Sequence, residues 1–150
     1  MPSRRTIAVL EDDPERIAHF RPLLVEHFPQ YELAFFEHAG EMTSWLESHF
    51  DEVVGMALDN DLPLRSMPDG TTQDCGEGRE VADWLATRPP RFPIVIHSTN
   101  TWAVEYMLDV LGLAGWRIER VIPFPGTRWM TRYWIGAVRG LLENDADARD

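Results

Sequence analysis

The sequence predicts an open α/β fold in which a parallel sheet lies between two layers of helices. Strand-like and helix-like segments alternate five times along the chain, which is typical of that architecture. Two apolar runs, residues 7–10 and 53–58, end abruptly in carboxylates, as buried strands do when their ends carry a site. With 150 residues, 44% hydrophobic and 26% charged, the chain has the size and composition of one globular domain.

The first strand is predicted over residues 6–10 and is followed by a helix. Asp13 and Pro14 predict the start of this helix, because Asp caps helices and Pro suits the first helical position. Pro29 ends it. Four apolar residues at helical spacing form its buried stripe: Ile17, Phe20, Leu24 and Phe28.

The other elements follow in the same alternation. Their boundaries come from hydrophobic periodicity, from prolines and glycines between segments, and from capping residues. We expect strands over residues 31–36, 53–58, 94–97 and 116–122. We expect helices over residues 39–48, 78–87, 101–111 and 128–143.

Two segments of this single domain, residues 1–150, fall outside the alternation. Residues 60–78 hold several prolines and glycines and form a long loop, which is either a lid over a site or a solvated insertion. Residues 144–150 are polar and mostly acidic, so we expect a frayed tail there.

Right-handed crossovers leave few topologies for such a chain, and the flavodoxin-like strand order 2-1-3-4-5 is a common one. That order places the first strand beside the third. The carboxylates of Glu11, Asp12 and Asp59 then share one small volume at the carboxyl edge of the sheet. Close carboxylates repel unless a cation neutralises them, and oxygen ligands favour a hard cation. The sequence therefore predicts a Mg²⁺ site.

Composition limits the functions to consider. The formal net charge of −11 argues against an extended nucleic-acid footprint, and all 14 basic residues are arginine. The single cysteine, Cys75, allows no internal disulfide and fits a reducing compartment. No apolar run reaches the length of a membrane span, and the N-terminus lacks the apolar core of a signal peptide. We expect a cytoplasmic protein with no membrane contact.

These residues resemble the receiver domains of two-component response regulators over nearly the whole chain. Receivers carry an acidic pair after the first strand, a phosphoaccepting aspartate before a Leu-Pro pair after the third, and a Ser or Thr after the fourth. The matching residues here are Glu11, Asp12, Asp59, Leu62, Pro63 and Ser98.

Two departures distinguish the chain from an ordinary receiver. The family places a lysine before a proline at the end of the fifth strand, but residues 121–124 read Val-Ile-Pro-Phe. About ten extra residues also separate Pro63 from Gly78, where the loop of the family is usually short.

The chain more closely resembles an atypical branch, the cyclic-phosphate processing receiver domains. Members show a Leu-Asp-x-Asp-Leu motif, as in residues 58–62, and His-Ser-x-Asn after the fourth strand, as in residues 97–100. A methionine follows in the family, here Met107. This branch is proposed to act on phosphate groups, such as those at RNA ends.

The resemblance implies roles for the acidic residues. Asp59 would be the phosphoacceptor or nucleophile, because a carboxylate can form an acyl phosphate. Asp12, Asp59 and the backbone carbonyl of Asp61 would bind Mg²⁺, with Glu11 holding a metal-bound water. The Asp61 side chain is either a general acid/base or a solvated loop carboxylate. The alternative for the acids is that they cap helices and solvate strand ends.

Ser98 would donate a hydrogen bond to a phosphoryl oxygen, or is simply a turn residue at the strand end. Strand alternation points His97 away from Ser98, so His97 is either a buried, hydrogen-bonded core histidine or, if a bulge turns it toward the site, a substrate-binding residue. Asn100 either contacts substrate or caps the next helix. Arg128, and after it Arg120, are the candidates to replace the absent lysine, because arginine binds phosphate well.

Three functions are compatible with these residues. The first is a receiver that accepts a phosphoryl group on Asp59 from a histidine kinase or a small phosphodonor. The second is a Mg²⁺-dependent hydrolase of phosphate esters, including cyclic phosphates. The third is a degenerate receiver used only for protein contacts, which the intact acids Glu11, Asp12 and Asp59 argue against. Whether the protein is an enzyme stays open at this point.

Overall fold

The computed structural model describes residues 4–149, and the side chains of residues 4–145. Its central sheet is parallel, with the strand order β2-β1-β3-β6-β7. Counting only these five strands, the order is 2-1-3-4-5, so the predicted topology is confirmed. The strands are β1 (Thr6–Leu10), β2 (Glu32–Phe36), β3 (Val53–Leu58), β6 (Ile94–His97) and β7 (Ile118–Val121).

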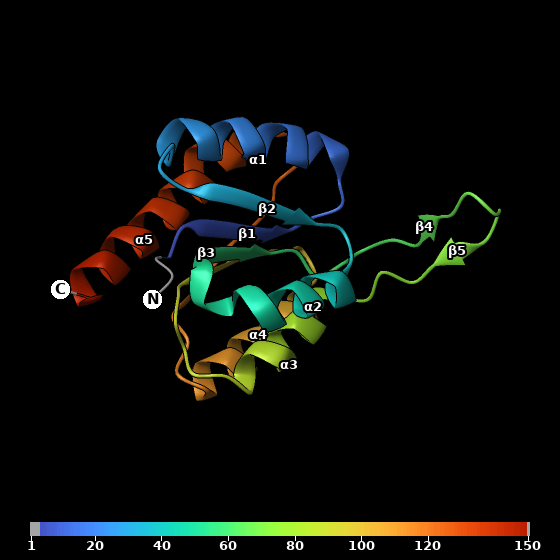
Figure 1. The fold of residues 1–150 in the computed structure, drawn as a ribbon. Helices are drawn as coiled ribbons and strands as arrows, with labels where there is room; N and C mark the ends of the chain where they lie inside the picture. Colours follow the sequence, from blue (N-terminus) through green and yellow to red (C-terminus); the bar gives the residue numbers. More distant parts are fainter. Residues whose placement is uncertain (1–3, 150) are drawn as a thin grey trace.

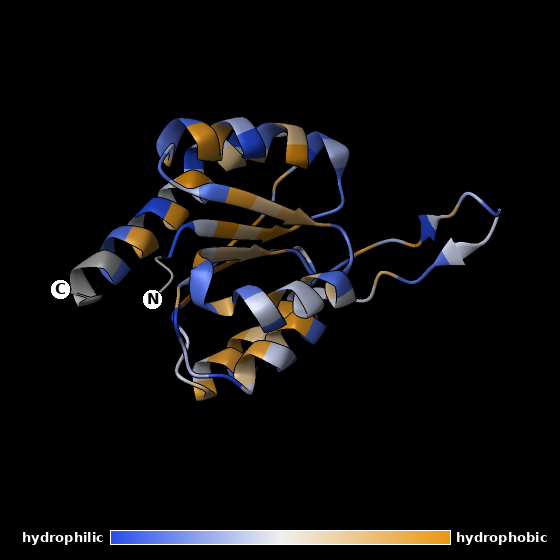
Figure 2. Cartoon of the chain, in the orientation of Figure 1, coloured by the Kyte–Doolittle hydropathy of each residue, from blue (hydrophilic) through white to orange (hydrophobic). Residues whose placement is uncertain are grey.

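Helices cover both faces of the sheet (Figure 1). One face packs against α1 (Pro14–His27) and α5 (Ile135–Arg149). The other packs against α2 (Ala39–His49), α3 (Gly78–Ala86) and α4 (Thr101–Leu113), with the short helix η1 (Phe50–Glu52) before β3. Each face has its own hydrophobic core, and Figure 2 shows the apolar strands enclosed between the helices. No helix in the described part of the chain is both long and apolar enough to cross a bilayer.

The start of α1 follows the sequence prediction and positions two residues beside the sheet edge. The Asp13 carboxylate accepts hydrogen bonds from the backbone N–H groups of Glu15 (2.9 Å) and Arg16 (3.4 Å). Pro14 occupies the first helical position. This cap fixes the turn between Asp12 and α1, and it places Arg16 in the first turn of the helix.

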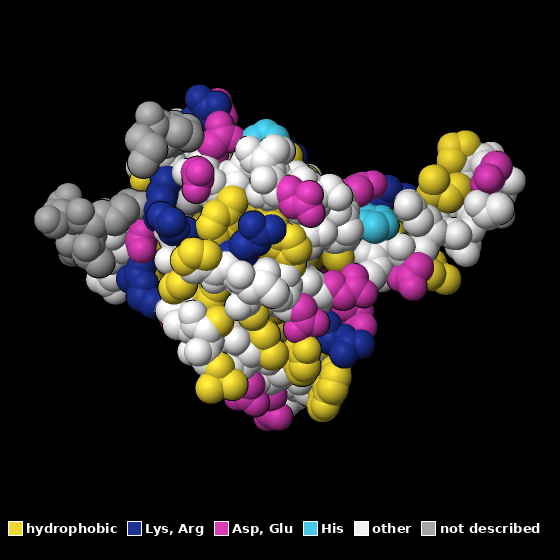
Figure 3. Space-filling view, turned by 60° about the horizontal axis from the view of Figure 1, so that its bottom comes forward, with side chains coloured by type: hydrophobic (Ala, Val, Ile, Leu, Met, Phe, Trp, Pro, Cys, Tyr) yellow, Lys and Arg dark blue, Asp and Glu magenta, His cyan; other side chains and the backbone are white. Residues whose placement is uncertain are grey.

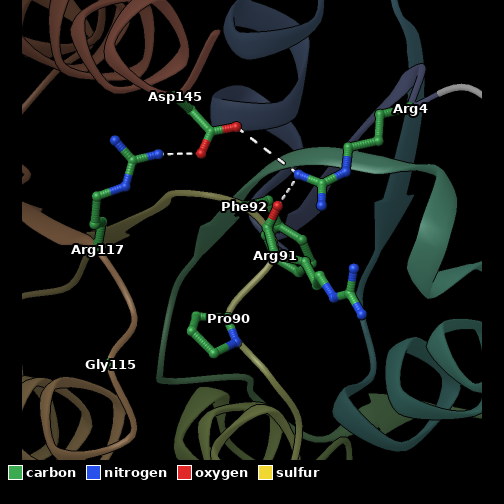
Figure 4. Close-up of a pocket in the computed structure, with 7 residues that line it drawn as sticks. All are labelled: Arg4, Pro90, Arg91, Phe92, Gly115, Arg117 and Asp145. Carbon is green, nitrogen blue, oxygen red and sulfur yellow. Dashed lines mark hydrogen bonds and ion pairs between the residues drawn. The ribbon is translucent and has the colours of Figure 1, made fainter. Parts of the chain in front are cut away.

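The C-terminal region differs from the expectation. A π-helical turn (η2, Met130–Trp134) precedes α5, and α5 continues to Arg149 through most of the segment expected to fray. Asp145 explains part of the difference, because its carboxylate pairs with Arg117 and Arg4 across a cavity of about 290 Å³ (Figure 4). These ion pairs connect α5 to the amino ends of the strands, whereas the acidic residues lie at the carboxyl ends.

The long segment between β3 and α3 is not irregular throughout. It contains a two-stranded antiparallel hairpin, β4 (Arg65–Ser66) and β5 (Thr72–Gln73), closed by a turn at Gly70 with φ of 86°. We call residues 65–73 the arm. It projects from the end of the sheet where the strands have their carboxyl ends (Figure 1).

The base of this segment packs tightly under α3, and Gly78 makes that packing possible. A Cβ at Gly78 would lie 2.0 Å from the carbonyl oxygen of Asp59, and the Gly78 N–H donates to the carbonyl of Asn60 (2.9 Å). Glycine is therefore required here by the close approach of two backbones.

We predict that Gly78→Ala destabilises the protein by about 2 kcal/mol or more, because the added methyl group forces β3 and α3 apart. Urea denaturation measures this loss. The control is Gly112→Ala within α4, where a Cβ would meet nothing within 4 Å and the helix should gain slightly. Equal stability of the two variants would contradict the packing described.

Candidate functional site

Three neighbouring strands end in one aligned row of polar residues. Leu10 is in register with Leu58, and Leu58 with Ile96, so the next residues are Glu11, Asp59 and His97. Leu10, Leu58 and Ile96 belong to the core under α2, α3 and α4. Because side chains alternate along a strand, the polar row points to the opposite face, toward α1 and α5.

Glu11 is fully buried and fully engaged. One carboxylate oxygen lies 3.3 Å from Nε2 of His97 and 3.2 Å from Nη1 of Arg16, and the other accepts the N–H groups of Asp12 (3.0 Å) and Asp13 (3.4 Å). Burial is the largest influence on its pKa and opposes ionisation. The hydrogen bond and charge of His97, with the charge of Arg16, outweigh burial and lower the pKa to about 2. Glu11 is therefore an anion in the folded protein.

Asp59 lies beside this anion with only 6% of its surface exposed. Its Oδ1 accepts the N–H of Asn60 (2.8 Å), and its Oδ2 lies 3.9 Å from Nη1 of Arg16. Burial, and then the charge of Glu11, raise the pKa of Asp59 to about 8. Without a further cation, this carboxyl is protonated through most of the neutral range.

Asp12 completes the group that we call the acidic cluster: Glu11, Asp12 and Asp59. One carboxylate oxygen of each lies within 4.8 Å of the others. Burial and the neighbouring Glu11 raise the pKa of Asp12 to about 6. Two carboxyls with raised pKa values beside a third that is ionised indicate a site that lacks positive charge. An all-oxygen donor set of this kind fits a hard divalent cation such as Mg²⁺.

Arg16 is the positive residue that sequence reasoning missed. It contacts both Glu11 and Asp59, and its guanidinium also lies over the ring of Trp129, 5.5 Å from the ring centre. Residue spacing gave no signal for this role, because Glu11 and Asp59 lie outside the helix that carries Arg16, and the i, i+4 rule applies only within a helix. The structure thus brings a cation to the acids from α1 rather than from the fifth strand.

Neither of the two arginines predicted to replace the family lysine forms a hydrogen bond or ion pair with the described side chains of the acidic cluster. Arg128 is exposed, and its side chain makes no hydrogen bond or ion pair with the described residues. Arg120 donates to the carbonyl of Ser98 at 3.5 Å. Ile122, one residue beyond the partner of His97 on β7, is 47% exposed.

The residues after β3 and β6 form a connected network. Asn60, which sequence reasoning also missed, is fully buried, and its side-chain oxygen accepts the Arg79 N–H at the start of α3 (3.1 Å). Its amide donates to the Asp61 carboxylate (2.9 Å), and the Asn100 amide donates to the same oxygen (3.1 Å). Asn100 also caps α4 through the Ala103 N–H (3.0 Å), which is one of its two predicted roles.

Ser98 and His97 occupy different surroundings, as alternation predicts. The Ser98 hydroxyl accepts the Asn100 N–H (3.1 Å) in a buried turn. His97 is completely buried and meets the ring of Phe20 edge to face at 5.1 Å. It is the expected hydrogen-bonded core histidine, but its partner is Glu11, so it supports the acidic cluster from behind.

We predict that Asp59→Asn stabilises the metal-free protein by about 1 kcal/mol at pH 8.5, because a buried anion beside Glu11 is removed. Folding raises the pKa of Asp59 from 3.8 to about 8, so the native chain keeps a proton that the unfolded chain loses. The contribution of Asp59 to wild-type stability therefore falls as the pH rises from about 4 to 8, since its carboxyl binds fewer protons in the unfolded chain there.

Urea denaturation in EDTA at pH 5 and pH 8.5 measures both proteins. The free energy of unfolding should differ between variant and wild type by about 1 kcal/mol at pH 8.5. At pH 5, where wild-type Asp59 is protonated, the difference should be much smaller. A variant less stable than the wild type at pH 8.5 would show instead that the Asp59 carboxylate contributes net stability.

Comparison with known proteins identifies the family to which the chain is similar. Residues 7–112 match the family described as the cyclic-phosphate processing receiver domain. A comparison with curated protein sequences gives no match.

Several of the solved structures that resemble the chain are response-regulator or receiver domains. The phosphorylated cyanobacterial phytochrome response regulator RcpA matches with a TM-score of 0.73 and 16% identity, over 95% of this chain and 96% of its own. The receiver domain of an HD domain-containing protein from Pseudomonas fluorescens gives 0.67 and 16%, over 96% and 98%. The response regulator domain of Thermotoga maritima CheB gives 0.66 and 11%, over 93% and 97%.

These identities establish the fold alone, while the family match covers more than half of the chain and includes β1, β3 and β6 with the residues that follow them. The chain belongs to the cyclic-phosphate processing receiver domain family.

Proposed function

We propose that the protein is a receiver that accepts a phosphoryl group on Asp59 in the presence of Mg²⁺. The observation that carries this proposal is the position of the Asp59 carboxylate beside Asp12, Glu11 and Arg16 at the carboxyl edge of a parallel sheet. A ligand bound at this edge meets the ends of several strands, as in other open α/β folds. A histidine kinase or a small phosphodonor would supply the phosphoryl group.

In this proposal the two oxygens of Asp59 have different tasks. Oδ1 is held by the Asn60 N–H, which fixes the carboxylate plane, while Oδ2 faces Arg16. Oδ2 attacks phosphorus, the bond from phosphorus to the donor oxygen or nitrogen breaks, and an acyl phosphate forms on Asp59. Mg²⁺ bound by Asp12 and Asp59 supplies positive charge to the phosphoryl oxygens and keeps Asp59 ionised. The Asp61 carbonyl remains a candidate third protein ligand.

Arg16 takes over part of the work of the absent lysine in this proposal. Its guanidinium already lies between Glu11 and Asp59, so it can turn toward a phosphoryl oxygen without a large movement of α1. Arginine offers several N–H donors to phosphate in a planar fork. In the phosphate-free protein the same side chain partly neutralises the acids and therefore competes with a divalent cation.

Hydrolysis of a phosphate ester is the second candidate function, and Asp61 favours it. Its carboxylate is exposed and is held by the amides of Asn60 and Asn100, so a second carboxylate is positioned two residues beyond Asp59. In a cyclic phosphate, a water oxygen would attack phosphorus while one P–O bond breaks. Asp61 would accept the proton of the water and return it to the leaving oxygen. The name of the family supports such a substrate.

We predict that incubation with an acyl phosphate donor and Mg²⁺ adds the mass of one phosphoryl group to the wild type. Asp59→Asn should show no adduct, because the amide is not a nucleophile of comparable strength. Intact-mass spectrometry measures both. No adduct, together with Asp59-dependent opening of a 2′,3′-cyclic phosphate, would overturn the phosphoacceptor assignment in favour of the hydrolase.

We also predict opposite effects of Arg16→Gln on two ligands. Mg²⁺ should bind roughly fivefold more tightly, since a competing cation worth about 1 kcal/mol is removed. Beryllofluoride, a phosphoryl mimic, should bind more weakly at saturating Mg²⁺, because a contact to its fluorines is lost.

Calorimetric titration measures both affinities. The matched control is Arg21→Gln on the same helix, whose guanidinium lies 4.4 Å from the centre of the Phe35 ring. It should leave both affinities unchanged. If Arg16→Gln weakened Mg²⁺ binding, Arg16 would be organising the cluster rather than competing with the metal.

A further inference from the structure

An exposed group of planar side chains on α3 and α4 has no role in the function proposed so far. We call Arg79, Trp102 and Tyr106 the stacking platform. Trp102 is 61% exposed, whereas the five other tryptophans are buried or half-buried. Figure 3 shows the face of the molecule formed by the α2–α4 layer, where hydrophobic side chains reach the surface among acidic and basic ones.

The platform is ordered by contacts among its members. The rings of Trp102 and Tyr106, one helical turn apart on α4, stack with their centres 5.8 Å apart and their planes 22° apart. The Arg79 guanidinium, from the first turn of α3, lies 5.2 Å from the ring centre of Trp102 and 5.9 Å from that of Tyr106. Three flat, polarisable groups from two helices therefore face one another.

Carboxylates fix the polar ends of two of these groups. Glu77 binds Nε (3.0 Å) and Nη2 (2.9 Å) of Arg79, and Asp83 accepts the hydroxyl hydrogen of Tyr106 (2.6 Å). A ligand that stacks here meets side chains whose rotational freedom is already reduced. That lowers the entropic cost of binding.

Hydrogen bonds connect the platform to Asp59. The Arg79 N–H donates to Asn60, whose own N–H donates to Asp59. On the other side, Asn100 lies two residues before Trp102 and donates to Asp61. Both connections start at the carboxyl ends of adjacent strands, β3 and β6. The platform and the acidic cluster thus share one edge of the sheet.

We propose that the stacking platform binds the aromatic base of a nucleotide whose phosphate group reaches the acidic cluster. Flat bases stack on tryptophan and on arginine planes without sequence preference, and stacking on an aromatic side chain contributes strongly to binding. A planar site beside a phosphate site is the arrangement that a nucleotide requires. The phosphate part of this proposal rests on the proposed function, whereas the base part rests on the platform alone.

Charge limits the ligand to a single nucleotide. Asp61, Glu77 and Asp83 surround the platform, and the protein carries a net charge of −11. A long polyanion would be repelled beyond the few contacts that the edge offers. A mononucleotide, or the terminal nucleotide of a strand, presents one base and one phosphate to the site.

Titration of the full chain with 2′,3′-cyclic AMP and Mg²⁺ tests the proposal by calorimetry. Trp102→Ala should weaken binding at least tenfold, and Trp102→Phe should restore most of it, because a smaller ring still stacks. Tyr133→Ala is the matched control, since Tyr133 is a 53% exposed aromatic residue outside the platform, and it should bind as the wild type does. Equal affinity of Trp102→Ala and the wild type, or no binding to the wild type, would overturn the proposal.

Further titrations separate this inference from the function proposed for Asp59. Adenosine, which has a base but no phosphate, should bind weakly and lose binding in Trp102→Ala but not in Asp59→Asn. Beryllofluoride should bind Trp102→Ala as it binds the wild type, because it has no base. Adenosine binding that depends on Trp102 in a protein that forms no Asp59 adduct would support the platform and contradict the phosphoacceptor role alone. Adenosine binding that is insensitive to Trp102 would overturn the platform.

Discussion

Repulsion among three converging carboxylates is the constraint on which the rest of this structure depends. Glu11 remains ionised because His97 and Arg16 hold it, and burial together with the charge of Glu11 then disfavours ionisation of Asp59 and Asp12. The fold supports this arrangement with two side chains that contact Glu11: His97 at the buried end of β6, and Arg16 in the first turn of α1. The packing of the core restricts the positions of the three acids, because Glu11 and Asp59 directly follow buried strands and Asp12 lies in the turn after one of them.

Much of this could be predicted from the sequence. The alternation of elements and the acidic strand ends define both the topology and the meeting of Glu11, Asp12 and Asp59, because strand order determines which ends are neighbours. Arg16 and Asn60 were not predicted. Their roles depend on side-chain direction at a helix start and on the hydrogen bond from the Arg79 backbone N–H to the Asn60 side chain, and neither leaves a pattern in residue spacing. The structure of the arm was missed because two-residue strands are too short to show periodicity.

The absence of lysine changes where positive charge enters the site. In this chain the cation comes from α1, four residues after Asp12, and the end of β7 presents the apolar Ile122 instead. His97 also fills the polar row at the end of β6, next to that edge. The half of the site nearest β1 and α1 is therefore rich in charge–charge contacts. Around His97, by contrast, the neighbouring side chains include the rings of Trp129 and Trp134.

The base of the arm has a consequence for how this domain can vary. The Asn60 carbonyl accepts the Gly78 N–H, and Asp61 pairs with Glu77 in an antiparallel bridge, so the two ends of the insertion are joined before the arm begins. The entropic cost of closing a loop rises only slowly with its length once the ends are fixed. The contacts between the two ends of the insertion therefore do not depend on the length of the chain between them. A longer, shorter or exchanged arm would leave the hydrogen bonds between the two ends of the insertion in place.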